Sequence, residues 1–389
     1  MLGVQEIGLS LDSRECVVLT SRRKGEIEES RTPALAQVRG SQIQAVGQRA
    51  YRLVGKSKDI VSVFPGRLED PTILGGYLER VLPRASAFRR RRLWASVPTA
   101  ASSQLQMSLR SCLEQSLGAK ETVLVPELLA AALGVGFPVL RVEDDSQRAR
   151  MVVHIGTTRI AAGVFVDGTL SGLMVREESW DRLVREVQEN LQFRLGTSLG
   201  FNTFFKVVRT LSRNFFERQL SEPARPKPPV PVEATPPHES SELEPSVEAL
   251  PELSPPANLR SFSERGLIEY VIEDDVISRS IDIQIKNLLF SLEKVIFGCF
   301  SHLRGVGRGE IASDLFSDRI VLCGEMLFEP VALARYFTRL TRFRFDAANG
   351  NPVAKGLRRI LTSDLASKRA FHELCLQIHE QEKLRFSLL

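Results

Sequence analysis

Short apolar segments of strand length alternate with helical patterns between residues 93 and 175, and this alternation most strongly constrains the fold. The expected strands are residues 93–98, 122–125, 151–158 and 160–166, and the expected helices run through residues 109–113 and 127–134. Strands that alternate with helices are typical of a mostly parallel sheet covered on both faces. We therefore expect an α/β protein.

Length and charge bound the organisation of the chain. Its 389 residues suffice for two domains that each bury a core, and 43% hydrophobic and 25% charged residues are ordinary for a globular protein. The net charge of +5 is modest, and residues 89–92 are the one dense basic run, Arg-Arg-Arg-Arg. We interpret this run as a solvated loop before a strand, and a patch for anionic lipid or nucleic acid is the alternative. Nucleic acid is not an expected partner.

Cysteine usage and hydropathy bear on the compartment. The five cysteines are odd in number and show no C-x-x-C spacing, which favours a reducing cytoplasm over a disulfide framework. Residues 1–10 lack the basic start and apolar core of a signal peptide. No apolar run reaches the roughly 18 residues that would span a bilayer. The expectation is a cytoplasmic protein.

Two segments carry a family resemblance. Residues 124–138 read L-V-P-E-L-L-A-A-A-L-G-V-G-F-P, which resembles the E-P-x-A-A-A-x-G-x-G-x-P segment of the bacterial actin MreB. Residues 151–158 read M-V-V-H-I-G-T-T, which is similar to the second phosphate loop of that family, usually D-I-G-G-G-T-T. The likeness extends in order from about Ile7 to about Leu361, with a break between Leu220 and Ser261.

The resemblance implies an actin-like (ribonuclease H-like) fold, in which two domains of mixed sheet are flanked by helices and carry smaller inserted subdomains. We expect domain I over residues 1–147, with an insertion at about 31–65, and domain II over residues 148–389, with an insertion at about 180–275. Residues 221–258 hold eleven of the chain's 20 prolines among Glu and Ser. Such a composition predicts a disordered insertion.

The first phosphate loop of the family would lie near residues 8–12. Gly8 stands where the family has its metal-organising aspartate, and Ser10 stands where it has a glycine. Asp12 is either a slipped substitute for that aspartate or a hairpin turn residue. Glu127 matches the glutamate that positions the attacking water in relatives. The alternative is an ordinary glutamate in the first turn of a helix.

The second phosphate loop departs from the family pattern. His154 replaces the aspartate, and Gly156 is the one glycine where the family has three. A histidine cannot organise the water shell of Mg²⁺ as a carboxylate does. Thr157 and Thr158 are retained. No Cys, His or paired acid lies near His154 in the sequence, so no metal site is expected.

In the remaining nucleotide loops, too, residues that contact nucleotide in the family are replaced. Residues 177–181 carry two acids where the family has two glycines. The ribose-contacting glutamate falls on Phe205, with Lys206 beside it. In the adenine loop only Gly324 remains, followed by Glu325. Ser10, Asp12, Gly156, Thr157, Thr158, Lys206, Gly324 and Glu325 would therefore form a vestigial nucleotide site, with Glu127 as the candidate catalytic residue.

Members of the MreB family polymerise with ATP on the inner membrane face and guide cell-wall synthesis. Because the changes affect every nucleotide loop, we expect a pseudo-ATPase scaffold for cell shape or intracellular organisation that needs no cofactor. The expected partners are a second copy of itself or another bacterial actin, and membrane-associated cell-wall or organelle-positioning proteins. A location at the inner face of the cell membrane is an alternative to a purely cytoplasmic one. Two alternatives remain: an active ATPase that uses ATP and Mg²⁺ through Glu127, Thr157 and Asp12, or a monomeric adaptor.

Overall fold

In a computed structural model of the chain, the described residues are 4–12, 14–22, 25–54, 57, 59–64, 70–83, 90–137, 139, 149–156, 159–166, 169–177, 186, 189, 213, 215–221, 259–264, 268–311, 315, 319–324, 330–341, 343–348 and 350–386. The expected Pro-rich insertion at 221–258 lies outside these residues, apart from Ser221.

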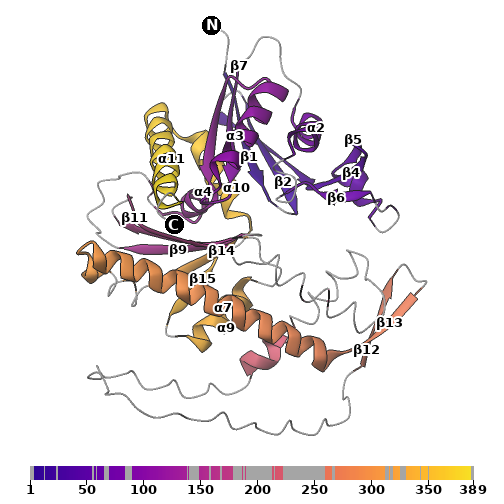
Figure 1. The fold of residues 1–389 in the computed structure, drawn as a ribbon, viewed down its shortest axis with the longest axis vertical. Coiled ribbons are helices and arrows are strands. Elements are labelled where there is room, and N and C mark those ends of the chain that lie inside the picture. Colours follow the sequence, from indigo (N-terminus) through magenta and orange to yellow (C-terminus); the bar gives the residue numbers. More distant parts are fainter. Residues whose placement is uncertain are drawn as a thin grey trace.

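The first five-stranded sheet has the order β3-β2-β1-β7-β8 (Figure 1). Its strands are β1 (Val4–Leu11), β2 (Glu15–Ser21), β3 (Ile27–Pro33), β7 (Arg90–Val97) and β8 (Glu121–Pro126). β1, β2 and β3 form an antiparallel meander, whereas β7 and β8 run parallel to β1.

The second five-stranded sheet repeats this order as β11-β10-β9-β14-β15. Its strands are β9 (Arg150–Ile155), β10 (Ile160–Val166), β11 (Thr169–Arg176), β14 (Arg319–Gly324) and β15 (Arg344–Ala347). Again three antiparallel strands are followed by two that run parallel to the first. The two halves therefore share one topology, with a hairpin at corresponding places in each.

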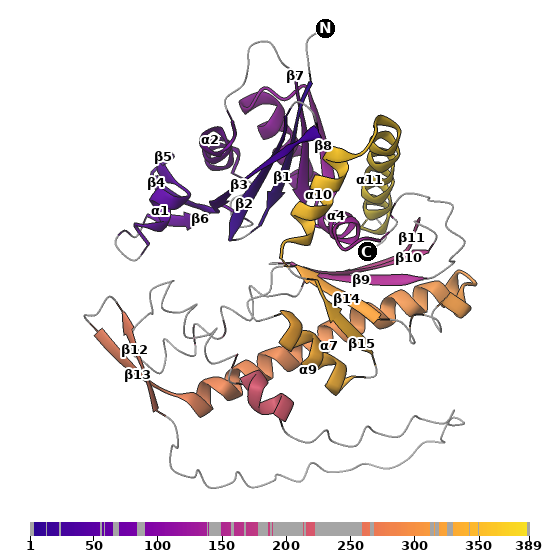
Figure 2. The ribbon, with the colours of Figure 1, turned by 180° about the vertical axis from the view of Figure 1, so that it is seen from behind.

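Helices cover both faces of each sheet, so that the molecule has five layers (Figures 1 and 2). One outer layer contains α2 (Pro71–Val81) and α3 (Ser103–Ser111), and the middle layer contains α4 (Glu127–Gly134), α10 (Pro352–Thr362) and α11 (Leu365–Phe386). The other outer layer contains α7 (Asp274–Gly305) and α9 (Pro330–Leu340). Alternating strand residues face opposite layers: in β7, Leu93 packs with α2 and α3, and Trp94 packs in the middle layer.

Smaller elements project from these layers. A three-stranded sheet of order β5-β4-β6 comprises β4 (Leu35–Arg39), β5 (Gln42–Val46) and β6 (Ile60–Ser62), with the short α1 (Gln48–Tyr51) beside it. A five-residue π-helix (Cys112–Ser116) continues α3, and β12 (Leu259–Glu264) pairs with β13 (Ile268–Glu273) as a separate hairpin.

The middle layer explains the small residues of α4. A Cβ on Gly134 would lie 1.9 Å from the Pro352 carbonyl oxygen, and a Cβ on Gly356 would lie 1.9 Å from the Ala130 carbonyl oxygen. The backbones of α4 and α10 therefore cross in direct contact, which no larger side chain would allow. The first residue of α10, Pro352, thereby lies against Gly134, the last residue of α4.

The basic run at residues 89–92 differs from the expected solvated loop. That expectation is wrong for the described part of the run, because β7 begins at Arg90. Arg91 is buried and donates to the carbonyl oxygens of Leu117 and Pro83, while Arg92 pairs with Glu121 at 2.6 Å. The expected domain boundary at residue 148 stays a prediction, and α10 and α11, which follow it, pack against strands of the first sheet.

Candidate functional site: a cavity between the two sheets

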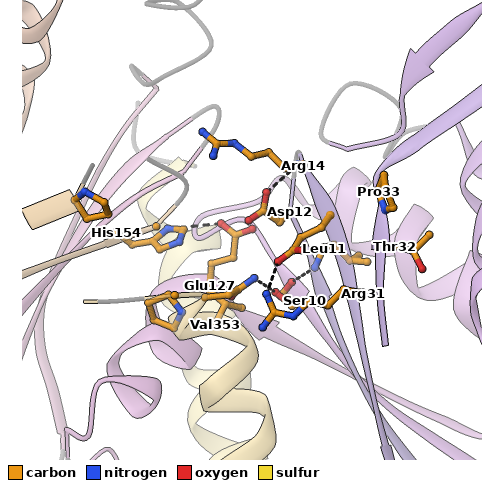
Figure 3. Close-up of a pocket in the computed structure, with 17 residues that line it drawn as sticks. Ser10, Leu11, Asp12, Arg14, Arg31, Thr32, Pro33, Glu127, His154 and Val353 are labelled. Carbon is orange, nitrogen blue, oxygen red and sulfur yellow. Dashed lines mark hydrogen bonds and ion pairs between the residues drawn. The ribbon is translucent and has the colours of Figure 1, made fainter. Parts of the chain in front are cut away.

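A cavity of about 520 Å³ opens where the β1–β2 turn, the end of β9 and the first turns of α4 and α10 meet (Figure 3). Its lining includes Ser10, Leu11, Asp12, Arg14, Glu15, Arg31, Thr32, Pro33, Ser96, Glu127, His154, Gly324, Pro330, Gly350, Asn351, Pro352 and Val353. Residues from both halves of the molecule therefore line one cavity.

The β1–β2 turn satisfies its own backbone donors. The Asp12 N–H donates to the Glu15 carbonyl oxygen at 3.1 Å, and the Arg14 N–H donates to Asp12 Oδ1 at 2.9 Å. Asp12 is thus bonded within the hairpin turn. The N–H groups of Asp12 and Arg14 are already used within the turn.

The wall beside this turn is built on Ser10 and Asn351. Asn351 caps α10, since its Oδ1 accepts from the Ala354 N–H at 2.9 Å. The other end of its amide donates to the Oγ of buried Ser10 at 3.5 Å. The Oγ of Ser96 in β7 accepts from the Leu11 N–H at 2.8 Å and fixes the end of β1.

Glu127 and His154 meet across the floor of the cavity. Glu127 is the first residue of α4, directly after β8, whereas His154 lies in β9 and is 3% exposed. His154 Nδ1 lies 3.8 Å from Glu127 Oε2, and Figure 3 shows the ring and the carboxylate pointing toward one another. The ion pair, formed when the imidazole is protonated, joins a residue from each half of the molecule.

The β9–β10 turn also closes on itself. The Gly156 N–H donates to the Arg159 carbonyl oxygen at 2.8 Å. A Cβ on Gly156 would lie 3.5 Å from His154 Cε1 and 3.6 Å from Glu127 Oε2, so Gly156 sits directly above the Glu127–His154 pair. This N–H is therefore engaged within the turn.

Arg159 links that turn to the first half of the molecule. Its Nη1 donates to the carbonyl oxygens of Thr99 (at 3.3 Å) and Ala100, in the loop after β7. Ala100 has φ 60°, a left-handed conformation that is uncommon for a residue with a Cβ. In the same loop the Thr99 Oγ1 accepts from the Leu128 N–H at 3.0 Å and so holds the start of α4.

Charges at the mouth are arranged in pairs. Arg31 Nη1 lies 3.1 Å from Glu15 Oε1, and Arg31 Nε lies 2.7 Å from Glu29 Oε1. The hydrogen bond from Arg31 to Glu29 raises the pKa of the guanidinium.

Burial raises the pKa of the Cys323 thiol, and the negative charge of Glu127 raises it further. Cys323 is thus a neutral thiol rather than a nucleophile.

The structure brings four expected site residues together and leaves others undescribed. Ser10, Asp12, Glu127 and Gly324 line the cavity, and Gly156 adjoins it. Thr157, Thr158, Lys206 and Glu325 lie outside the described residues. The sequence interpretation missed the place of Asn351 in the cavity wall, although Asn before Pro is a signal for a helix start. It also missed the contact of His154 with Glu127, since a pair 27 positions apart has no linear signal.

The donor set can be compared with the needs of a metal-bound triphosphate. Such a ligand requires free backbone N–H groups and a carboxylate for the metal's water shell. The β1–β2 and β9–β10 turns use the N–H groups of Asp12, Arg14 and Gly156 internally, and His154 faces Glu127 at 3.8 Å. Within the described residues, no group of three or more His, Cys, Asp or Glu could hold a metal ion.

The sequence profile of the MreB/Mbl protein family matches residues 4–178. The resemblance to the MreB family is confirmed. This match covers both hairpins of the cavity and Glu127, and stops soon after β11. No curated protein sequence matches the chain significantly.

Solved structures of similar, actin-like fold cover 92–94% of the chain. MreB5 of Spiroplasma citri bound to AMPPNP has a TM-score of 0.65 at 15% identity, over 94% of this chain and 97% of that one. The ADP-bound form of MreB5 has a TM-score of 0.63 at 15% identity, over 92% and 96%. A MamK double helical filament has a TM-score of 0.56 at 11% identity, over 92% and 97%. In the part of the chain that the structure describes, no helix is long and apolar enough to span a membrane.

Proposed function

We propose that this protein is an MreB-like, actin-fold scaffold that assembles with copies of itself or with another bacterial actin, and that binds ATP weakly or not at all. Its work would be the support of cell shape or of intracellular organisation. ATP turnover would not time its assembly.

The Glu127–His154 contact carries this proposal. In the resembling family the glutamate positions a water and the aspartate of the second loop helps to hold Mg²⁺. Here the carboxylate of Glu127 is directed at an imidazole 3.8 Å away, which is 3% exposed. A cationic imidazole would repel Mg²⁺, and a neutral one is a poor ligand for that hard ion.

The two turns support the same reading. A phosphate is bound by backbone N–H groups that converge on it. The N–H groups of Asp12, Arg14 and Gly156 are instead satisfied inside their own turns. A triphosphate bound by these three groups would have to break these bonds first.

Self-assembly is supported by the fold and by the family. The MreB/Mbl profile matches residues 4–178, and one structure of similar fold is the MamK double helical filament. MreB5 has been crystallised with ADP and AMPPNP, so the same fold accommodates nucleotide in that protein. We therefore attribute the weak or absent ATP binding proposed for this protein to its site residues and not to its fold.

Calorimetry and thermal melting with Mg-ATP test the nucleotide part. A ligand at 100 times its Kd stabilises a protein by about 2.7 kcal/mol, which would be a clear shift in melting temperature. At about 1 mM Mg-ATP, which is on the order of cellular levels, we expect neither a shift in melting temperature nor a heat of binding. A shift that Gly156→Val abolishes would overturn the proposal, because Gly156 adjoins the pair without taking part in it.

Sedimentation tests the scaffold part independently. We expect the full chain to form pelletable polymer to the same extent with Mg-ATP and without it. A chain that stays in the supernatant, alone and with a co-expressed bacterial actin, would remove the scaffold reading and favour a monomeric adaptor.

A further inference from the structure

The outer face of α7 carries a stripe of exposed apolar side chains. Ile283, Phe290 and Phe297 are 57%, 57% and 49% exposed. They are seven residues apart, and such residues lie within about 20° of one another around a helix. Contiguous exposed apolar groups of this kind are typical of interaction sites.

This stripe is separate from the helix's contribution to the core. The opposite side of α7 packs buried residues such as Ile281, Ile285 and Leu292 against the second sheet. Figures 1 and 2 show α7 along the side of that sheet that faces away from the first one. Phe297 also contacts the fold, where its ring lies 5.5 Å from that of Phe343.

Basic residues accompany the stripe. Arg279, Lys286, Lys294 and Arg304 are exposed, and each stands three, four or seven residues from a member of the stripe, on the same side of α7. Lys294 Nζ lies 4.1 Å from the centre of the Phe290 ring, so that a charge lies beside the apolar surface. We call Ile283, Phe290, Phe297 and these four basic residues the α7 face.

The acids of α7 do not balance these basic residues. Between residues 279 and 305 they are Asp282 and Glu293, and both are only partly exposed. Asp282 is paired with Lys286 at 2.6 Å. Burial raises the pKa of Glu293, which favours its neutral form. The α7 face is therefore apolar and cationic.

The α7 helix of a second copy does not fit this face. If two α7 helices met antiparallel about Phe290, Lys286 of one would face Lys294 of the other. If they met in parallel, each basic residue would face its own copy. Repulsion between like charges opposes both arrangements.

The chain itself contains a stretch of the complementary composition. Residues 239–253, which lie outside the described residues, hold five glutamates and neither lysine nor arginine. Among these acids Leu243, Val247, Leu250 and Leu253 recur at every third or fourth position. We call residues 239–253 the acidic segment. It combines apolar side chains with the charge opposite to that of the α7 face.

The acidic segment enters the described structure beside the start of α7. β12 begins at Leu259, and Leu259 pairs with Glu273, the last residue before α7. Figure 1 shows the β12–β13 hairpin at one end of α7. An extended chain covers about 20 Å in the six residues from Leu259 back to Leu253, whereas Ile283 lies about 14 Å along α7. The near end of the stripe is therefore within reach.

The far end of the stripe is within reach as well. An extended chain from Leu259 back to Leu243 spans up to about 53 Å, and Phe297 lies about 35 Å along α7. On the other side of the segment, Phe215 and Phe216 precede Ser221 and belong to the same core cluster as the buried side of α7. Both attachments of the segment therefore lie on the half of the molecule that carries α7.

We propose that the α7 face binds the acidic segment of the same chain. The aliphatic side chains of the segment cover the stripe, and its glutamates lie near the basic residues. The composition of the segment does not supply a core of its own, so this face provides the apolar contacts that it lacks. Because the binding is intramolecular, its effective concentration is on the order of 1 mM, and any separate acidic partner has to displace the segment.

This inference goes beyond the proposed scaffold function and does not depend on nucleotide or polymer. Thiol cross-linking in the full chain tests it, because the five native cysteines are buried and engineered thiols will react selectively. Ser246→Cys places one thiol in the acidic segment, and Asn287→Cys places another on the exposed side of α7. A short bismaleimide should join them within one chain, which changes its migration in denaturing electrophoresis.

A second position separates docking from simple proximity. Arg335 is exposed on α9, in the same outer layer as α7, and Arg335→Cys replaces Asn287→Cys in the control chain. A tether without a docking site would serve both positions alike. Docking should make the reaction at position 287 about tenfold faster. Salt at about 0.5 M should reduce this difference, because exposed charges are screened.

An apolar variant tests the stripe with the tether unchanged. Ile283→Ser with Phe290→Ser removes exposed apolar groups and spares Phe297, which packs on Phe343. In the chain with thiols at positions 246 and 287, this variant should slow cross-linking about tenfold, since buried apolar anchors dominate binding.

A charge exchange tests the polar contacts. Arg279→Glu with Lys294→Glu reverses the charge of the α7 face, and Glu244→Lys with Glu248→Lys reverses that of the acidic segment. Either pair alone should slow cross-linking by about fivefold or more, and the two pairs together should restore it. The segment pair lies outside the described fold, so it decides the matter if a face variant lowers the melting temperature.

Each outcome decides the proposal. Fast cross-linking at position 287 that falls in the single-sided variants and returns in the charge exchange supports it. Equal rates at positions 287 and 335 overturn it, as do unchanged rates in the variants. Cross-links between two chains, seen as a dimeric band, would assign the face to the segment of another copy and overturn binding within one chain. None of these readouts depends on the sedimentation test of the scaffold function.

Discussion

His154 Nδ1 lies 3.8 Å from Glu127 Oε2, and this contact joins β9 of the second sheet to the first turn of α4. Around it the turn residues Asp12 and Gly156 bond within their own hairpins. The centre of the cavity is therefore held together by the protein's own groups. The Glu127–His154 contact thus links the two halves of the molecule at the cavity.

A double-mutant cycle on this pair should give a favourable coupling. We expect Glu127→Gln, His154→Asn and the double variant to yield an interaction of about 0.5–3 kcal/mol in urea unfolding at pH 6. The pair is largely shielded from water, which strengthens it. The exposed Arg213–Glu217 pair is the control and should give about 0–1 kcal/mol. A coupling no larger than the control would show that the two residues do not hold the halves together.

Arg159→Met should weaken the connection between the β9–β10 turn and the first sheet. The change removes the donors to the carbonyl oxygens of Thr99 and Ala100 and keeps the apolar stem. Hydrogen bonds from charged groups are worth about 1.5–3 kcal/mol, so we expect a loss near that size in chemical denaturation. Arg22→Met, in an exposed pair with Glu28, should cost far less. Equal losses would contradict the role given to Arg159.

Gly356→Ala should destabilise the protein by more than about 1 kcal/mol, because overpacking forces backbone shifts. The added Cβ would lie 1.9 Å from the Ala130 carbonyl oxygen, and both groups belong to helix backbones that cannot turn aside. Gly305→Ala is the matched control, since a Cβ there would have no heavy atom within 4 Å. Denaturation midpoints measure both changes. A neutral Gly356→Ala would mean that α4 and α10 lie further apart.

Asp364 should stabilise α11 only at pH values above the pKa of its carboxyl group. The Ser367 N–H donates to Asp364 Oδ1 at 2.8 Å, and this hydrogen bond lowers the pKa of the carboxyl from 3.8. A lowered folded-state pKa gives stability that is complete above the unfolded value and is lost as the pH falls through the folded value. Asp364→Ala should therefore lower the melting temperature at pH 7, and the difference should shrink below pH 3.8. A difference independent of pH would show that the charge is irrelevant.

The five cysteines should resist modification in the folded protein. All five are buried free thiols, and burial raises the pKa of Cys16 to about 12. Because the thiolate is the reactive form, Ellman's reagent at pH 8 should modify none of them within minutes. After denaturation in guanidinium all five should react. Fast reaction in the native state would point to opening of the layers around at least one of these cysteines.

Much of the fold could be predicted from local patterns. The periodicity of residues 93–166 gave strands and helices within a few positions, because alternating and helical spacing reflect which faces are buried. The sequence shows that the small residues of α4 match a family segment, but it does not show why these residues must be small. That reason is the close approach of α10, more than 200 residues later, which no local pattern encodes.

The site was predictable only in part. The sequence allows two interpretations each of Asp12 and Glu127, and in the structure Asp12 is bonded inside its turn while Glu127 faces His154. The run at Arg91 was misjudged because consecutive arginines read as solvated. Carbonyl oxygens of Leu117 and Pro83 satisfy that buried guanidinium, and these partners are set by tertiary packing.

The sequence by itself determined the α/β architecture, the likeness to MreB and the loss of glycines and acids from the phosphate loops, because residue types and spacing are local properties. Only the tertiary structure decided which contacts form around the altered phosphate loops. It set His154 against Glu127, tied Arg159 to Ala100 and left Phe290 facing outward, because contacts between distant segments depend on how whole layers stack.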